Sequence, residues 1–481
     1  MQTLYKHRRP GPAFLPDEDE GSKQKYKEFD FTLRGIKDLE SIDWYDIQAA
    51  SKSETGSRGV AFLQTKEGSV ALKAPIDIPL EFFTYLIMKF LKVKCPEMRI
   101  IRFSDPEYDK VYASIDASTY HDQVMNSMLH SKLRCPFLMV FEYISGISFP
   151  KLGPTRANHF LSGRDPISRS RLINLGILLS VDTLLNNSDR IPILWDNRGN
   201  TENLLFQCIS EEYTHDQLLD YDYVNLNFDY LYAIDNRPSL LDHRDSITAP
   251  NIIKYLGRLE NFLKAVFKDL SDVMKAKIDI MADSKIQLES IAMIVKWIKT
   301  YSGYDIPSIG QLQLLLGIII GYTNLTGLNK GILDKFYEEV CLFGQNDYKD
   351  YWKNSCKTIH IPFLVEVLES VKIACNNNPA EVSFAHHVTL NQYKLEELAF
   401  EEFMGNPIRK PEKPFSEVEE EELEFVIYDE SEAEIERDPK RHNSWLRRKL
   451  KEVFSIDEEK LEANEEQKSQ KEDSKEGNNN A

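Results

Sequence analysis

Apolar positions divide the chain into a short β-prone part followed by a longer helical part. Two β-prone runs, at residues 59–64 and 69–74, predict strands, and Lys66-Glu67-Gly68 between them is typical of a hairpin turn. Further strands are predicted at 98–103, 110–115 and 137–144, and helical spacing predicts one helix at 81–91. The pattern therefore favours a small, mostly β unit that contains a single helix.

After residue 150 the periodicity becomes helical. Four leucines recur at the spacing of a buried helix over residues 170–186, at Leu172, Leu175, Leu179 and Leu184. Strands are predicted at 204–209 and 230–234, and later helices at 259–274, 288–300 and 309–323. These elements predict an α+β protein, in which residues 35–143 form the β-rich part and residues 144–400 the helical part.

Composition and charge narrow the class of protein. The 481-residue chain is 42% apolar, which allows a sizeable core and excludes wholesale disorder, collagen and coiled-coil rods. Its formal charge of −18 argues against a protein that coats nucleic acid. Residues 411–481 hold 23 acidic and 12 basic residues, and so carry −11 of that charge. We therefore expect 401–481 to be mostly disordered, with a short amphipathic helix at 444–454, and 1–34 to form a flexible arm.

Cysteine spacing and apolar runs bear on location. The six cysteines include no C-x-x-C pair, so a zinc site is not expected. The basic run Lys6-His7-Arg8-Arg9 is not followed by the apolar core of a signal peptide. The most apolar run, residues 312–322, is half the ~20 residues that a membrane-spanning helix needs. We expect a cytoplasmic monomer without a transmembrane segment.

A loop rich in glycine and small residues precedes the first of the predicted strands. Such a loop lets backbone N–H groups approach phosphate oxygens, although a hairpin also needs glycine for its turn alone. It lacks a complete G-x-G-x-x-G and leads into a strand rather than a helix, which argues against a Rossmann or Walker site. The candidate nucleotide-binding residues here are Gly56, Ser57, Arg58, Gly59 and Val60.

The next strand carries Ala71 and Lys73 on one face, because side chains alternate along a strand. The small side chain of Ala71 leaves room for a flat ring, and Lys73 could reach the α- and β-phosphates of a nucleotide. Glu81, at the start of the following helix, could pair with Lys73 and hold it in place, as kinases require. We therefore expect Ala71 to contact a nucleotide and Lys73 and Glu81 to form a catalytic pair.

Three polar residues stand at the ends of buried elements in the helical part. Asp189 leaves the buried helix on a loop, which suits a general base for a hydroxyl group. Asn203 stands where a strand begins and can offer Mg²⁺ an oxygen without adding charge. Asp235 ends a buried strand, and a carboxylate there suits a hard cation that bridges phosphates. Each residue taken alone also fits an ordinary turn or cap.

The order of these features along the chain is that of a kinase active site. The run LLNNSDR at 184–190 resembles the atypical kinases related to phosphoinositide kinases. Its continuation, with Pro192, Trp195, Asn197 and Gly199-Asn200 before Asn203, resembles the catalytic domain of the actin-fragmin kinase family. Segments 81–96 and 310–321 are also similar to that family, and the resemblance covers residues 40–350.

The resemblance implies a two-lobed, protein-kinase-like fold with ATP and Mg²⁺ between a small β-rich lobe and a larger helical lobe. Residues 141–144 would connect the lobes, and Glu142 and Ile144 would offer backbone groups to adenine. The implied roles are a phosphate contact for Lys73, a general base for Asp189 and metal ligands for Asn203 and Asp235. The implied substrate is actin, or actin bound to a capping protein, phosphorylated on threonine. A phosphoinositide-type lipid kinase and a pseudokinase scaffold remain the alternative readings.

Overall fold

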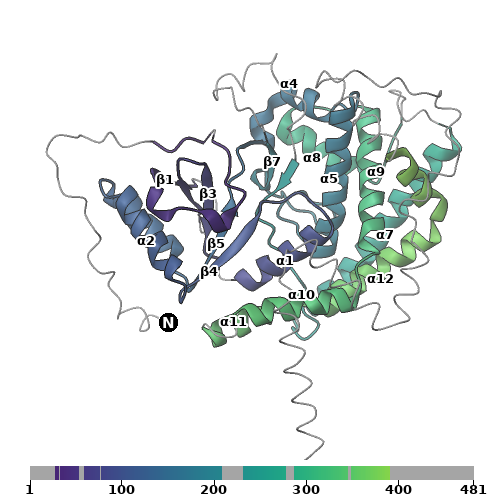
Figure 1. Ribbon diagram of the computed structural model, residues 1–481. Helices are drawn as coiled ribbons and strands as arrows, with labels where there is room; N and C mark the ends of the chain where they lie inside the picture. Colours follow the sequence, from purple (N-terminus) through teal and green to yellow (C-terminus); the bar gives the residue numbers. More distant parts are fainter. Residues whose placement is uncertain are drawn as a thin grey trace, which may run out of the picture. The chain divides into compact units, whose positions relative to one another are not determined.

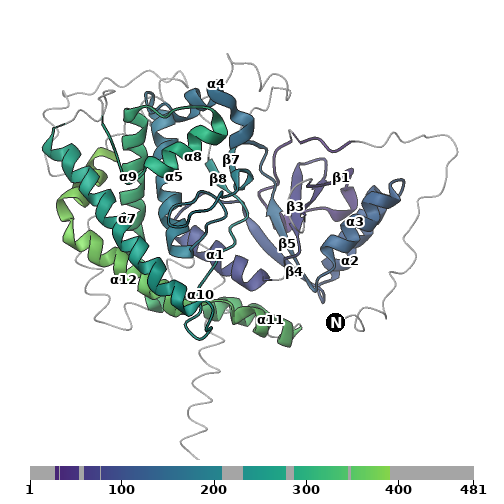
Figure 2. The same ribbon diagram turned by 180° about the vertical axis from the view of Figure 1, so that it is seen from behind.

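The computed structural model describes residues 28–31, 33–53, 59–75, 77–207, 231–277, 286–344 and 348–389. All of them belong to the first of two compact units, Met1–Gly405. The described residues end at 389, so the predicted acidic tail at 401–481 lies outside them. The described residues form a mixed α+β fold with two antiparallel sheets and a large set of helices, as Figures 1 and 2 show from opposite sides. The predicted α+β class is therefore confirmed.

The larger sheet has five strands in the order β1-β2-β3-β5-β4, all antiparallel to their neighbours. The four strands predicted at 59–64, 69–74, 98–103 and 137–144 are confirmed, and one further strand at the edge was not predicted. The strands are β1 Ala49–Lys52, β2 Ala61–Gln64, β3 Ser69–Lys73, β4 Met98–Arg102 and β5 Phe137–Glu142. This sheet presents two faces of different character.

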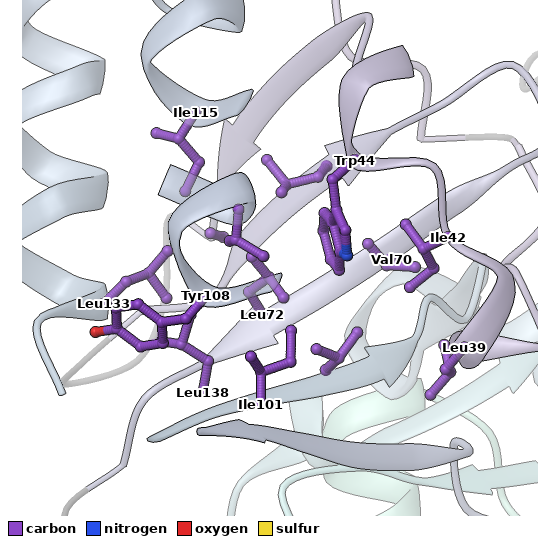
Figure 3. Packing of buried hydrophobic residues seen from close by; sticks show 14 of the residues in the cluster. Leu39, Ile42, Trp44, Val70, Leu72, Ile101, Tyr108, Ile115, Leu133 and Leu138 are labelled. Atoms are coloured by element: carbon purple, nitrogen blue, oxygen red, sulfur yellow. The ribbon is translucent and has the colours of Figure 1, made fainter. Parts of the chain in front are cut away.

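One face of the five-stranded sheet is buried in an apolar core. Leu72 of β3 and Leu138 of β5 pack there against Trp44, Tyr108 and neighbouring apolar side chains (Figure 3). The elements that cover this face are α2 Pro106–Ser118, α3 Gln123–Leu133, η1 Leu39–Ser41 and η2 Trp44–Asp46. Because side chains alternate along a strand, Ala71 and Lys73 point to the opposite face. Helix α1, Ile78–Phe90, lies on that side (Figures 1 and 2).

The strand predicted at 110–115 is wrong, because these residues lie within helix α2. Asp105 and Pro106 begin the helix, and Tyr108, Val111 and Ile115 are buried at the i, i+3, i+7 spacing of one helical face. The β-branched residues of 110–115 suggest a strand only when this longer spacing is ignored. Helix α3 was not predicted either, so the described residues of the β-rich part form three α-helices rather than the one expected.

A second, three-stranded sheet has the order β6-β7-β8 and leads into the helical part. Its strands are β6 Gly146–Ser148, β7 Leu204–Gln207 and β8 Leu231–Ala233, so the strands predicted at 204–209 and 230–234 are confirmed over their described residues. The helices that follow β6 are α4 Phe149–Leu161, α5 Pro166–Leu185, η3 Thr201–Asn203, α7 Ala249–Lys275, α8 Ala292–Ser302, α9 Ser308–Leu325, α10 Lys330–Phe343, α11 Lys349–Cys356 and α12 Ile361–Asn377. Residues 379–389 are also helical.

Helix α5 is fixed in the helical part by close contact with α9. A Cβ atom at Gly176 would lie 2.5 Å from the backbone nitrogen of Ile318, and one at Gly317 would lie 2.2 Å from the carbonyl oxygen of Ile173. Only glycine therefore allows the two backbones to approach this closely. The Ser180 hydroxyl also donates to the Ile318 carbonyl at 2.7 Å. Helix α5 ends at Leu185, where Asn186 takes a left-handed φ of 49°, and the loop that carries Asp189 begins there.

Helix α9 is long and apolar enough to cross a membrane by composition, and among the described residues it is the one such helix. However, 78% of its apolar window is buried inside the protein, much of it against α5 (Figure 1). Burial of this kind is what a central core helix shows, so the length and composition of α9 are weak evidence for a membrane span.

The segment before η1 packs along the five-stranded sheet and the linker that leaves it. The Ile36 amide donates to the Ser69 carbonyl, and the Ser69 amide donates to the Arg34 carbonyl, each at 3.0 Å. The hydroxyl groups of Tyr143 and Ser145 both donate to the Phe31 carbonyl at 3.0 Å. The described residues 28–31 and 33–36 thus hold the linker between β5 and β6.

Candidate active site

Lys73 stands at the end of β3 and contacts two carboxylates. Its Nζ donates to the two carboxylate oxygens of Glu81 at 2.8 and 2.9 Å, and it also pairs with Asp235. Glu81 lies in the first turn of α1, where a carboxylate also favours the helix dipole. Lys73 and Asp235 are 162 residues apart in the sequence, so the fold brings a strand, a helix and a distant segment to one point.

Burial and charge act against each other at this pair. Burial alone would lower the pKa of Lys73, but the carboxylates of Glu81 and Asp235 outweigh it and raise the pKa above its usual value. Burial raises the pKa of Glu81, and the Lys73 charge offsets part of that effect. Lys73 is therefore held in the charged form that can bind a phosphate group.

Asp189 and Asn203 lie together on the loop after α5. The Asn203 amide group donates to the backbone carbonyl of Asp189 at 2.7 Å and to its carboxylate at 3.3 Å. The Asn203 Oδ1 accepts from Asn200 at 3.2 Å, which leaves it a second lone pair. The loop between Asp189 and Asn203 turns at Gly199, whose φ of 67° is left-handed. A Cβ atom added there would lie 2.3 Å from the Arg190 carbonyl oxygen, so this position requires glycine.

The pKa of the Asp189 carboxyl is raised above its ordinary value. The first cause is partial burial, which removes some of the hydration that favours the charged form. The second cause is the negative charge of Asp235, and the hydrogen bond from Asn203 opposes both. A raised pKa brings an aspartate closer to the range in which it can exchange a proton with a hydroxyl group.

Asp235 follows β8 in a conformation that few residues with a Cβ adopt. Its φ is 50°, in the left-handed region, and 44% of its side chain is exposed. The Ile234 amide donates to the Asn203 carbonyl at 3.1 Å, and the Asn236 side chain donates to the Ala233 carbonyl at 3.0 Å. Neighbouring residues therefore hold the backbone of Asp235 in a strained form, as is common at functional sites.

The predicted nucleotide contacts are only partly described. Gly56, Ser57 and Arg58 lie outside the described residues, whereas Gly59 has a left-handed φ of 68°. The Val60 carbonyl accepts from the Ser53 amide at 2.8 Å, which closes the hairpin between β1 and β2. Ala71 is half-buried on the same face as Lys73, between Phe62 and Phe141 on the neighbouring strands.

Glu142 and Ile144 lie on and just after β5, apart from the Lys73–Asp235 cluster. The Glu142 side chain accepts from the Glu97 amide at 3.3 Å, and burial raises its pKa. The side chain of Glu142 is therefore engaged with the residue before β4, so any contact with a nucleotide would come from its backbone. Ile144 is buried in the linker to β6. Their predicted contact with adenine stays a prediction.

Two contacts around the site were not predicted. Arg237 pairs with Asp77 at 2.7 Å, which ties the start of α1 to the segment after Asp235. Arg190 is fully buried and donates to groups beside both Asn203 and Asp235. The one sequence signal for Arg190 is its place directly after Asp189, because a buried arginine leaves no mark in a hydropathy pattern.

The donor set fits a magnesium ion and a phosphate group. The described parts of the chain contain no group of three or more His, Cys, Asp or Glu side chains able to hold a metal. Magnesium needs few protein ligands when phosphates complete its shell, and it prefers carboxylate and amide oxygens such as those of Asp235 and Asn203. Lys73 supplies the cation for the phosphate. These residues could therefore hold a metal–nucleotide complex together, although none would hold a metal alone.

A strand lysine paired with a helix glutamate, next to an aspartate–asparagine loop and a second aspartate, is the arrangement of catalytic residues used by kinases. A family model described as "Actin-fragmin kinase, catalytic" matches residues 21–322. The chain belongs to the actin-fragmin kinase catalytic family, which confirms the resemblance found in the sequence. This membership supports a kinase-type phosphotransferase.

Two proteins of Dictyostelium discoideum are similar to this chain, and both carry the name "Putative actin-fragmin kinase". One is 25% identical over 347 residues, which covers 69% of this chain and 74% of that protein. The other is 26% identical over 321 residues, or 65% of this chain and 64% of that protein.

Proposed function

We propose that the protein is an ATP- and Mg²⁺-dependent serine/threonine protein kinase that acts on actin or an actin-associated protein. The observation that carries the proposal is the contact of Lys73 with both Glu81 and Asp235, next to the Asp189–Asn203 pair. Family membership supports the reaction class, and the names of the Dictyostelium relatives suggest actin as the substrate. In this proposal the chain works as a cytoplasmic monomer with a two-lobed, kinase-like fold.

Each residue of the site has a role in this reaction. Lys73 binds the phosphates of the nucleotide, and Glu81 keeps its ammonium group in place. Asp189 accepts a hydrogen bond from the acceptor hydroxyl and orients it toward the transferring phosphate. Asn203 and Asp235 would hold the metal, which supplies positive charge that stabilises the phosphate oxygens. The adenine and phosphates would be surrounded by Ala71, Gly59, Val60, Glu142 at the end of β5 and Ile144 in the linker that follows.

The Lys73–Asp235 contact indicates how the ligands enter. Lys73 and Asp235 neutralise each other, so a phosphate that takes Lys73 leaves the Asp235 carboxylate without its cation. A metal that takes Asp235 removes one of the two carboxylates that pair with Lys73 and leaves Glu81 as the other. Phosphate and metal together satisfy both. We therefore expect magnesium to strengthen nucleotide binding, and nucleotide to strengthen magnesium binding, by the same factor.

The test is phosphate transfer by the full chain with labelled ATP and Mg²⁺. Actin, actin bound to a capping protein, casein and phosphoinositide vesicles are offered in parallel. We expect phosphothreonine on actin, with more label when the capping protein is present. Label on phosphoinositides would instead establish a lipid kinase. Nucleotide binding without transfer to any substrate would favour the pseudokinase scaffold.

A further inference from the structure

Arg190 carries a charge in a place without water. Its side chain is 0% exposed and is among the largest fully buried side chains of the described residues. A buried guanidinium is costly unless its N–H groups are hydrogen-bonded and its charge is paired. The hydrogen-bond and ion-pair partners of Arg190 therefore indicate which segments its guanidinium group holds together.

The guanidinium of Arg190 contacts three separate segments of the site. It pairs with Asp182 on α5, and its Nε donates to the Asn203 carbonyl at 3.2 Å. Its Nη2 donates to the Ile234 carbonyl at 3.2 Å and to the Asn236 side chain. The last two partners flank Asp235. A planar fork with five N–H donors can make such contacts at once, whereas a lysine ammonium has three donors at one point.

The same network reaches Asp189 through Asp182. The Asp182 carboxylate accepts from the Asn187 side chain at 3.2 Å, and the Asn187 Oδ1 accepts from the Asp189 amide at 3.2 Å. The Arg190 carbonyl also accepts from the Asn200 amide at 3.0 Å, which closes the loop before Asn203. The base and both metal ligands are thus connected to one side chain that itself does not face the substrate.

We propose that Arg190 is a positioning residue that sets the spacing between the loop with Asp189 and Asn203 and the segment with Asp235. The proposal rests on the proposed function, because that spacing matters when a metal and a phosphate bind between the two segments. A buried ion pair contributes little net stability compared with apolar side chains of similar volume. The carbonyl and amide partners of Arg190 are better explained by geometry than by stability.

The test compares Arg190→Lys with the wild-type full chain. Lysine keeps a positive charge beside Asp182 but cannot reach all the other partners. We expect the affinity for Mn²⁺ in the presence of ATP, measured by electron paramagnetic resonance, to fall about 10–100-fold, as for other residues that orient metal ligands. We expect kcat to fall similarly, whereas affinity for ATP without metal changes little. The Ile234 amide should exchange faster with deuterium, because its acceptor, the Asn203 carbonyl, loses the Arg190 contact.

The matched control is Arg99→Lys. Arg99 likewise bonds a carboxylate, Glu107 at 2.7 Å, and a backbone carbonyl, that of Leu39 at 2.6 Å, but on the core-facing side of the five-stranded sheet. The Arg99→Lys variant should leave both the Mn²⁺ affinity and the rate of deuterium exchange at the Ile234 amide unchanged. Equal effects in the two variants, or no change in Arg190→Lys, would overturn the proposal.

A second variant tests the proposal if Arg190→Lys does not fold. Asn236→Ala removes one hydrogen-bond partner of the Arg190 guanidinium, and we expect about a tenfold loss of Mn²⁺ affinity, at the low end of the range above. Unchanged affinity in Asn236→Ala would overturn the proposal. If the wild-type chain neither binds Mn²⁺ with ATP nor transfers phosphate, the proposed function fails. Hydrogen exchange then decides separately: faster exchange at Ile234 in Arg190→Lys supports the positioning role, and equal exchange overturns it.

Discussion

Lys73 and Arg190 both bring positive charge to the acidic site, but they differ in burial and in partners. The Lys73 side chain is 15% exposed, and its described partners are carboxylate oxygens of Glu81 and Asp235. Arg190 is 0% exposed, and two of its partners are backbone carbonyls. A cation bound to an exposed carboxylate can exchange that partner for a phosphate. A cation bonded to buried carbonyls holds the backbone and has no such exchange available.

The two cations meet at Asp235. Lys73 pairs with its side chain, and Arg190 bonds to the residues on either side of it. The backbone of Asp235 is strained, with a φ of 50°, and such a conformation persists only where its surroundings hold it. The comparison suggests a division of work, in which Arg190 shapes the site and Lys73 takes part in binding.

The largest effect on catalysis should come from substitution of the acidic residues near the two cations, Asp189 and Asp235. We expect Asp189→Asn to lower kcat by about 10²–10⁴, because the amide cannot accept a proton, with nucleotide binding near normal. Asp235→Ala should instead weaken Mg²⁺-dependent nucleotide binding. Titration of ATP with and without Mg²⁺ separates the two. Asp196→Asn, an exposed aspartate of the same loop, is the control. Equal loss of binding in both site variants would mean that their roles are wrongly assigned.

Replacement of the exchangeable cation should have the next largest effect. We expect Lys73→Met to lower the rate of phosphate transfer by about 10²–10³ while the fold remains intact, because it removes an electrostatic contact rather than core volume. Lys89→Met, on α1 and paired with Glu97, is the matched lysine control. Steady-state rates and thermal unfolding of both variants give the measurement. Full activity in Lys73→Met would exclude Lys73 as the phosphate ligand.

The pH dependence should show a more moderate effect. Burial and the Asp235 charge raise the pKa of Asp189 above its usual value of about 3.9. As the pH falls through this raised pKa, Asp189 gains a proton and can no longer accept one. We expect kcat to decline on the acid side, starting at a higher pH than for an aspartate with its usual pKa, about tenfold per pH unit. A kcat that stays constant as the pH falls to that usual pKa would contradict the assignment of Asp189 as the base.

The smallest effect should come from the exposed pair between Arg237 and Asp77. Arg237 is 63% exposed, so water and salt screen its charge. We expect Arg237→Gln to change the free energy of unfolding by about 0–1 kcal/mol, as measured by urea denaturation. A much larger loss would show that this pair stabilises the fold despite its exposure, by holding α1 to the segment after Asp235.

Much of the site could be predicted from the sequence, because its residues stand at positions that local patterns define. Lys73 lies on a strand with a period of two, Glu81 opens a helix, and Asp189, Asn203 and Asp235 stand beside the ends of buried elements. Their order along the chain then indicates a kinase, and the match to the family confirms that membership. The strand predicted at 110–115 failed because a short β-branched run outweighed the longer helical spacing around it.

The sequence by itself therefore determined most of the strands, the helical character of the second part, the order of the site residues and the family. Only the tertiary structure decided the contacts between distant segments: the Lys73–Asp235 pair, the close approach of α5 and α9, and the fork of Arg190. The physical reason is that hydropathy and spacing report which face of an element is buried. They do not report which distant groups contact a buried charged side chain. For Arg190 these contacts, with Asp182, the Asn203 and Ile234 carbonyls and Asn236, define its proposed role.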